Sequence, residues 1–340
     1  MGIRYLNSFL KKKCPTSIRQ IHLEDLAHKH IAIDVSIYLY KFEADGMLLD
    51  NMRAFVSMLR QYEIHPTFVF DGKPPAEKMD TLFYRKQQRQ VAASECNDIT
   101  NRLQDIALPD EDKKKLVIEY DRLRRSSVVI TRDKVDLVKQ MFDEENVSYC
   151  TAPSEADTLC ATMVIHQNFW GCMSDDMDMF VYGCNNIIRD MNMKTHTAQL
   201  YVLPEILKEL DITYDNFKRV CVISGTDYNA SHALHVPVHL ENKSLQPTTL
   251  VTTSSYKCRK ENVPSSITLY VALKLLNRFR QNVKYSNMTF YDWLKHYIKF
   301  DIDYVALDNA YNMFSVPGSV PGSVPGSVPG STYIPKCNIL

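Results

Sequence analysis

The sequence predicts an α/β fold in which a mostly parallel central sheet is flanked by helices. Four short, apolar, β-rich runs without alternation favour strands that are buried on both faces. They cover residues 30–33, 67–70, 147–150 and 169–173. Between these runs, apolar side chains recur at helical spacing, at Met52, Phe55, Val56 and Leu59 and again at Val135, Leu137, Val138 and Met141. Strand, helix and strand in succession are typical of a parallel α/β sheet.

The composition excludes few classes of protein but sets the compartment. Lys+Arg and Asp+Glu number 40 each in 340 residues, so the net charge favours no class of partner. None of the nine cysteines lies in a CxxC pair, which favours free thiols over disulfides or a zinc site. No apolar run approaches the length of a signal peptide or a membrane span. We therefore expect a soluble intracellular protein with no membrane partner.

A polar, helix-prone insertion over residues 72–134 interrupts the alternation of strands and helices. Its flanks are basic, and residues 122–134 hold five Lys or Arg against one Asp. Charge alone leaves open whether the insertion is a functional surface or only a solvent-exposed helical segment.

Three regions are expected along the chain. The first is a core over 1–235 that contains the insertion, and the second is a mainly helical region over 236–313, with helical signals at 269–279 and 293–304. The third is a tail over 314–340, in which Ser-Val-Pro-Gly occurs four times from Ser315 to Gly330. Proline and glycine in every repeat preclude helix and sheet, so this tail is expected to be disordered.

Acidic residues follow each predicted strand. In a parallel sheet the strands' carboxyl ends meet at one edge, where active sites form, so these side chains should converge there: Asp34, Asp71, Glu155, Asp157, Asp176 and Asp178. Each one alone has a simpler explanation as a turn residue, a helix cap or a loop charge. Together, like charges at one edge require a compensating cation.

The residue types indicate which cation and which chemistry. Oxygen ligands without Cys or His neighbours favour Mg²⁺, with Mn²⁺ as an alternative, over zinc. Two such ions can clamp a scissile phosphate without a protein nucleophile. The sequence has no GxSxG motif, no evident Cys-His pair and no Walker phosphate loop, which argues against acyl transfer and nucleoside-triphosphate hydrolysis.

Six ordered motifs resemble the XPG/flap-endonuclease family of 5′-nucleases. They are MGIRYL at the start, IAIDVS at 31–36, VFDGKPP at 69–75, APSEAD at 152–157, SDDMDMFVYG at 174–183 and SGTDYN at 224–229. The resemblance implies a PIN-like fold, two Mg²⁺ ions and hydrolysis of phosphodiester bonds in DNA with a 5′ flap or a single-strand/duplex junction. It also implies seven metal ligands: Asp71, Glu155 and Asp157 hold one ion, with Asp34 alongside, and Asp176, Asp178 and Asp227 favour the second.

The same resemblance gives roles to residues outside the acidic set. Lys78 and Arg85 look like the family's pair of cations that hold the scissile phosphate. Tyr40 resembles an aromatic that stacks on a terminal base, although a core tyrosine is an equal alternative. Gly2 would lie near the site, and the insertion resembles an arch in which three arginines steer a single strand, namely Arg124, Arg125 and Arg132.

Two family features are missing from the sequence. After Asn229 there is no Gly-Ile-Gly hairpin, which puts that mode of duplex binding and a potassium requirement in doubt. The end of the chain, TYIPKCNIL, lacks the family's sliding-clamp motif. The diverged pattern resembles nucleases of large DNA viruses. We expect a monomer, and we favour the nucleus over the cytoplasm, meaning the host nucleus for a viral protein.

Two other functions remain open at this stage. A 5′-exonuclease acting on RNA or single strands would use the same chemistry on another polymer. A non-catalytic DNA-binding scaffold could inherit the fold, but it would have no physical reason to keep unpaired carboxylates together. An aspartyl phosphatase is disfavoured because Asp34 is not followed by a second acid two positions on.

Overall fold

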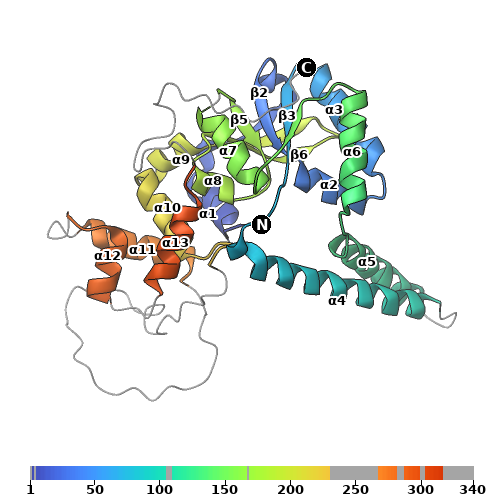
Figure 1. Ribbon diagram of the computed structural model, residues 1–340. Helices are drawn as coiled ribbons and strands as arrows, with labels where there is room; N and C mark the ends of the chain where they lie inside the picture. The colour runs from blue at the N-terminus through green and yellow to red at the C-terminus, as the bar shows by residue number, and fades with distance from the viewer. Residues whose placement is uncertain are drawn as a thin grey trace.

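A computed structural model describes residues 2–3, 5–104, 109–166, 168–229, 267–281, 287–298 and 303–316, with the side chains of 297 and 298 left out. Within these residues the centre is a seven-stranded sheet of order β1-β7-β6-β5-β2-β3-β4 (Figure 1). Its strands are β1 (Ile18–His22), β2 (His30–Asp34), β3 (His65–Phe70), β4 (Tyr149–Thr151), β5 (Gly171–Met173), β6 (Asn186–Asn192) and β7 (Thr197–Val202).

The sheet is mostly parallel, as the sequence predicted. Strands β6, β5, β2, β3 and β4 pair in parallel, and β7 and β1 add an antiparallel edge. Side chains alternate between the two faces of the sheet along each strand. Each face packs into its own hydrophobic cluster. In β2, Ile31 and Ile33 pack into one hydrophobic cluster while Ala32 packs into the other.

Helices cover the two faces of the sheet (Figure 1). The cluster that contains Ile33 receives α2 (Val35–Ala44), α3 (Leu48–Gln61) and α6 (Arg132–Glu144). The cluster that contains Ala32 receives α1 (Leu6–Lys13), α7 (Ala156–His166), α8 (Asp178–Tyr182), α9 (Leu203–Leu210) and α10 (Tyr214–Ile223), together with the C-terminal helices. Among the helices of the described ranges, none is long and apolar enough to cross a bilayer.

The insertion between β3 and α6 forms a helical hairpin. A short 3₁₀ turn (Ala76–Lys78) leads into α4 (Met79–Leu103), and α5 (Asp110–Ser126) returns beside it. In Figure 1 the pair projects away from the sheet. Its own small cluster of Ala92, Cys96, Ile99 and Leu123 holds the two helices together.

The C-terminal region differs from the sequence prediction in two places. The helix α11 (Leu269–Arg280) agrees with it, whereas the helical signal at 293–304 does not correspond to one element. The chain instead forms α12 (Phe290–Trp293), a π-helical turn (Leu294–Ile298) and a separate α13 (Tyr304–Met313). The side chain of Asp303 accepts the backbone N–H of Ala306, so a new helix begins there.

The second difference concerns the start of the predicted tail. Phe314 and Val316 are 1% and 4% exposed and belong to the hydrophobic core, although the sequence assigns them to a disordered segment. Their apolar side chains find a site among the helices that local Pro-Gly composition cannot reveal. The remaining repeats, and the segment after Asn229 where the hairpin motif is missing, lie outside the described residues.

Candidate active site

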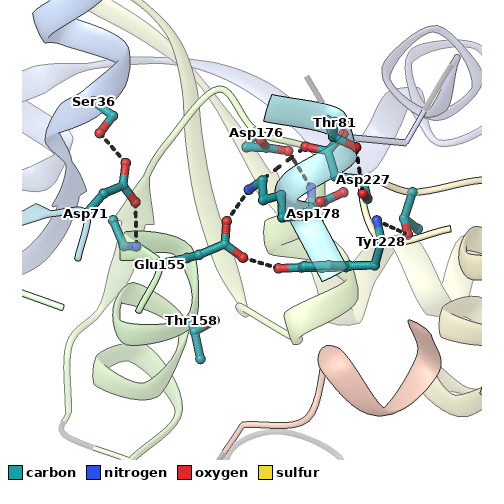
Figure 2. A network of polar contacts seen from close by, with 12 residues as sticks. Ser36, Asp71, Thr81, Glu155, Thr158, Asp176, Asp178, Asp227 and Tyr228 are labelled. Atoms are coloured by element: carbon teal, nitrogen blue, oxygen red, sulfur yellow. Dashed lines mark hydrogen bonds and ion pairs between the residues drawn. The ribbon is translucent and has the colours of Figure 1, made fainter. Parts of the chain in front are cut away.

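The carboxyl ends of β2 and β3 bring Asp34 and Asp71 together. Ser36 links the two carboxylates: its N–H donates to Asp34 Oδ1 at 3.0 Å and its hydroxyl donates to Asp71 Oδ2 at 2.6 Å. Asp71 Oδ1 also accepts the N–H of Ala156 at 2.8 Å, at the start of α7. This bond draws the loop that carries Glu155 towards the sheet edge (Figure 2).

Glu155 is buried between a cation and a phenol. Its Oε1 accepts a hydrogen bond from the Lys78 ammonium, and its Oε2 accepts one from the Tyr228 hydroxyl. Tyr228 in turn lies 2.9 Å, oxygen to oxygen, from Tyr182. Phe314 packs edge-on against both tyrosine rings, so the C-terminal region supports this corner of the site.

Asp176 and Asp178 follow β5 and are both buried. The Asp178 N–H donates to Asp176 Oδ1 at 3.0 Å, and the Ser174 hydroxyl donates to Asp34 Oδ2 at 3.3 Å. Gly2 lies against this pair, because a Cβ on it would meet Asp176 Oδ1 at 2.3 Å and Asp178 Oδ1 at 2.5 Å. Only glycine allows the N-terminal backbone to approach so closely.

Asp227 joins the cluster from the turn after α10. Arg85 on α4 donates to Asp227 Oδ2 at 2.6 Å, and the Lys78 Nζ lies 3.9 Å from the same oxygen. The Thr81 hydroxyl donates to the Asp227 carbonyl at 2.9 Å (Figure 2). Lys78 ends the 3₁₀ turn and Arg85 lies on α4, so both cations come from the base of the hairpin.

Burial and repulsion disfavour ionisation of these carboxylates. Burial first, then the charges of Asp71 and Asp176, raise the pKa of Asp34 to about 7. Burial and neighbouring acids also raise the pKa values of Asp157 and Asp178 well above the ordinary range. Burial opposes the charge of Lys78, but Glu155 and other acids outweigh it and raise the pKa of the ammonium. The cluster therefore needs more positive charge than Lys78 and Arg85 supply.

The donor chemistry fits divalent cations that prefer oxygen. The buried Oδ1 atoms of Asp157 and Asp178 have no hydrogen-bond partner, which is unfavourable unless a ligand satisfies them. In the described ranges, no three His, Cys, Asp or Glu side chains are already grouped as a metal requires. The charge of Lys78 opposes the rise in the pKa values of both Asp157 and Asp178. Carboxylate oxygens suit hard cations such as Mg²⁺, Mn²⁺ and Ca²⁺ better than they suit zinc.

A cavity of about 990 Å³ lies between the acidic cluster and the helical hairpin. Tyr40 lines it, is 39% exposed and accepts a bond from Arg89 at 3.4 Å. The alternative that Tyr40 is a core residue is therefore wrong, and Tyr38, stacked on Phe55 at 4.4 Å between ring centroids, fills that role. An exposed aromatic at this position can stack on a base.

The arginines expected to steer a strand are less available than the sequence implied. Arg124 and Arg125 both pair with Asp121, and Arg125 also pairs with Asp45. Arg125 lines the cavity, whereas Arg124 and Arg132 are not among its lining residues. Arg132 lies at the start of α6 and its side chain is 93% exposed, 3.9 Å from Asp136.

Sequence reasoning missed three residues that hold the carboxylates. Tyr228 donates to Glu155, Ser36 bridges Asp34 and Asp71, and Ser174 donates to Asp34. Each stands one or two positions from a predicted ligand, which was the available signal. All seven predicted carboxylates lie in or beside this network, together with Lys78, Arg85 and Gly2.

Comparison with known proteins agrees with this architecture. The XPG N-terminal domain matches residues 1–92 and the XPG I-region matches residues 146–227. Flap endonuclease 1 of Encephalitozoon cuniculi is 30% identical over 246 residues, covering 67% of this chain and 68% of the relative. A probable RAD2-like endonuclease of Invertebrate iridescent virus 6 is 25% identical over 280 residues, covering 67% of each chain.

Solved structures show the same fold. The catalytic core of Rad2 with DNA substrate superposes with a TM-score of 0.56 at 20% identity, covering 91% of this chain and 86% of that one. Flap endonuclease-1 from Methanococcus jannaschii gives 0.52 at 21% identity, covering 93% and 85%.

A mostly parallel sheet with acidic side chains at one edge and a helical hairpin above them is the architecture of 5′-nucleases. Within that class, the chain belongs to the XPG/flap-endonuclease family. It spans 60% of the length of the flap endonuclease 1 of Leishmania major, to which it is 29% identical.

Proposed function

We propose that the protein is a structure-specific endonuclease that hydrolyses phosphodiester bonds in DNA with a 5′ flap or a strand junction, in replication, repair or recombination. The main observation in support is the cluster of seven carboxylates beside the cavity that α4 and α5 bound. In this proposal the cavity holds a single strand next to the duplex. Rad2, whose catalytic core was solved with DNA, shares the fold.

Two Mg²⁺ ions are the proposed cofactors. Asp34, Asp71, Glu155 and Asp157 would hold one, and Asp176, Asp178 and Asp227 the other. When bound, such ions supply positive charge against the scissile phosphate and make an attacking water more acidic. The unpartnered Oδ1 atoms of Asp157 and Asp178 support this assignment.

The chain's own residues would position the phosphate and the acids. Lys78 and Arg85, which here contact Glu155 and Asp227, would turn to the scissile phosphate and offset its developing charge. Tyr228 would keep Glu155 in place through its hydroxyl. Tyr40 at the cavity wall would stack on an unpaired base.

Single-turnover cleavage of a labelled 5′-flap DNA in Mg²⁺ tests the proposal. Blunt duplex, single-stranded DNA and matched RNA are the comparison substrates, and Asp176→Ala and a chelator are the controls. We expect cutting near the flap junction that both controls abolish. Preferred cutting of RNA or single strands would reassign the substrate. DNA binding without any cleavage would favour a scaffold, and an active Asp176→Ala protein would contradict the metal assignment.

A further inference from the structure

Tyr5 combines strain with exposure at the edge of the site. It precedes α1 in the left-handed region, with φ 62° and ψ 0°, a conformation that favours glycine. Its side chain is nevertheless large and 75% exposed. Backbone strain of this kind is often found at functional sites, so the exposed Tyr5 ring is a candidate for contact with a ligand.

Among the described residues, no contact of the Tyr5 side chain supports the fold. The side chain accepts no capping hydrogen bond from the backbone N–H groups of α1. In the part of the chain that the structure describes, its ring has no aromatic partner. The residues after it supply the core contacts of α1, namely Leu6, Phe9 and Leu10.

Tyr5 lines a second pocket of about 470 Å³ that adjoins the acidic cluster. Gly2, Arg85 and Asp227 line the same pocket, and Arg85 also lines the large cavity under the hairpin. The two hollows therefore share Arg85, and carboxylates line each of them. A strand whose scissile phosphate lies at the carboxylates has neighbouring nucleotides that must be accommodated beside them.

A buried cation without a carboxylate partner in the described ranges lies at the wall of this pocket, with its guanidinium 5.6 Å from the centroid of the Tyr201 ring. Arg189 is 6% exposed, and its two NH groups donate to the Asp175 carbonyl at 2.6 Å and the Met177 sulfur at 2.7 Å. Its Nε has no acceptor, and no carboxylate pairs with it in the described ranges. A buried positive charge without a counter-ion favours binding of an anion, and the anions of a nucleic acid are its phosphates.

We propose that Tyr5 and Arg189 form a nucleotide subsite beside the scissile position, in which the Tyr5 ring stacks on a base and the Arg189 charge attracts the adjoining phosphate. The inference rests on the proposed nuclease function. It assigns the ligand class, a DNA nucleotide next to the cut, to a pocket separate from the hairpin cavity.

Two replacements of Tyr5 separate binding from folding. Tyr5→Gly removes the ring and relieves the backbone, whereas Tyr5→Phe keeps the ring without its hydroxyl. His28→Gly is the matched control, because His28 is also exposed with φ 61° but precedes the opposite, N-terminal end of β2. Each protein is titrated against flap DNA in single-turnover cleavage, and its melting temperature is measured.

We expect Tyr5→Gly to melt no lower than wild type yet to need a roughly 10-fold higher protein concentration for half-maximal cleavage. Tyr5→Phe and His28→Gly should stay within about twofold of wild type, since base stacking needs only the ring. If Tyr5→Gly reaches half-maximal cleavage at the same protein concentration as wild type, the proposed subsite is wrong, but the proposed nuclease function still stands. A wild-type protein that cuts no flap DNA would overturn the proposed function, and the subsite with it.

Discussion

Lys78→Met tests whether the ammonium compensates the acidic cluster until a metal binds. The Lys78 side chain is 12% exposed, donates to Glu155 and lies 3.9 Å from Asp227. Methionine keeps most of the side chain's length but removes its charge, so Glu155 is left buried without a cation. Removing one partner of a buried ion pair typically costs about 3–5 kcal/mol.

That loss is measurable by thermal unfolding. For a chain of this size each kcal/mol corresponds to about 2 °C, so the melting temperature in EDTA should fall by roughly 6–10 °C. Saturating Mg²⁺ should recover part of the loss, because ions held by the same carboxylates replace the missing charge. The Mg²⁺-induced rise should therefore be larger in Lys78→Met than in wild type.

Lys73→Met is the matched control. Lys73 lies five residues away, is exposed, and has no ion pair in the described ranges. Its replacement should leave both melting temperatures unchanged. The reasoning is refuted if Lys78→Met melts like wild type in EDTA, or if Mg²⁺ raises its melting temperature less than that of wild type.

Three further outcomes are expected from single contacts. Tyr228→Phe removes the hydroxyl that donates to Glu155, so the single-turnover rate should fall roughly 10-fold or more with flap affinity unchanged; an unaltered rate would show that Glu155 needs no such support. Arg85→Ala should slow the same step by roughly 10²-fold, and Arg85→Lys by less, unless the guanidinium serves only to pair with Asp227. Burial lowers the pKa of Lys218 from 10.5 to about 8, so between these pH values the unfolded chain holds a proton that the folded protein has released. The unfolding free energy of wild type should therefore rise relative to that of Lys218→Met, by up to roughly 3 kcal/mol between pH 8 and 10.5 in urea titrations. A constant difference between the two proteins would contradict this charge state.

The sheet and the convergence of the acids were predictable from the sequence for a simple reason. A buried parallel strand is a short apolar run, and the residue directly after it must lie at the sheet's carboxyl edge. Asp34 and Asp71 come at the ends of adjacent strands, so their proximity is a result of the order of the elements alone. Asp227 follows a helix and not a strand, and only the resemblance to a family identified it.

Contacts between distant segments were not predictable. Arg125 pairs with Asp45, which lies 80 positions earlier in the chain and outside the basic segment 122–134. Phe314 packs against Tyr182 and Tyr228, and this contact forms only when three distant segments of the chain come together. Local composition around Phe314, rich in Pro and Gly, indicates the opposite. Pairing partners and burial of this kind belong to tertiary structure, whereas periodicity reports only the local element.

The closeness of Gly2 to Asp176 and Asp178 has a practical consequence for anyone purifying the protein. A polypeptide fused ahead of this residue would have to leave the molecule directly past the carboxylates. The imidazoles of a histidine-rich affinity tag there would also compete with the carboxylates for the proposed metal ions. If the tag is left on the protein, the measured turnover could be low, or the metal preference altered, because of the tag itself. The tag should therefore be removed before any assay.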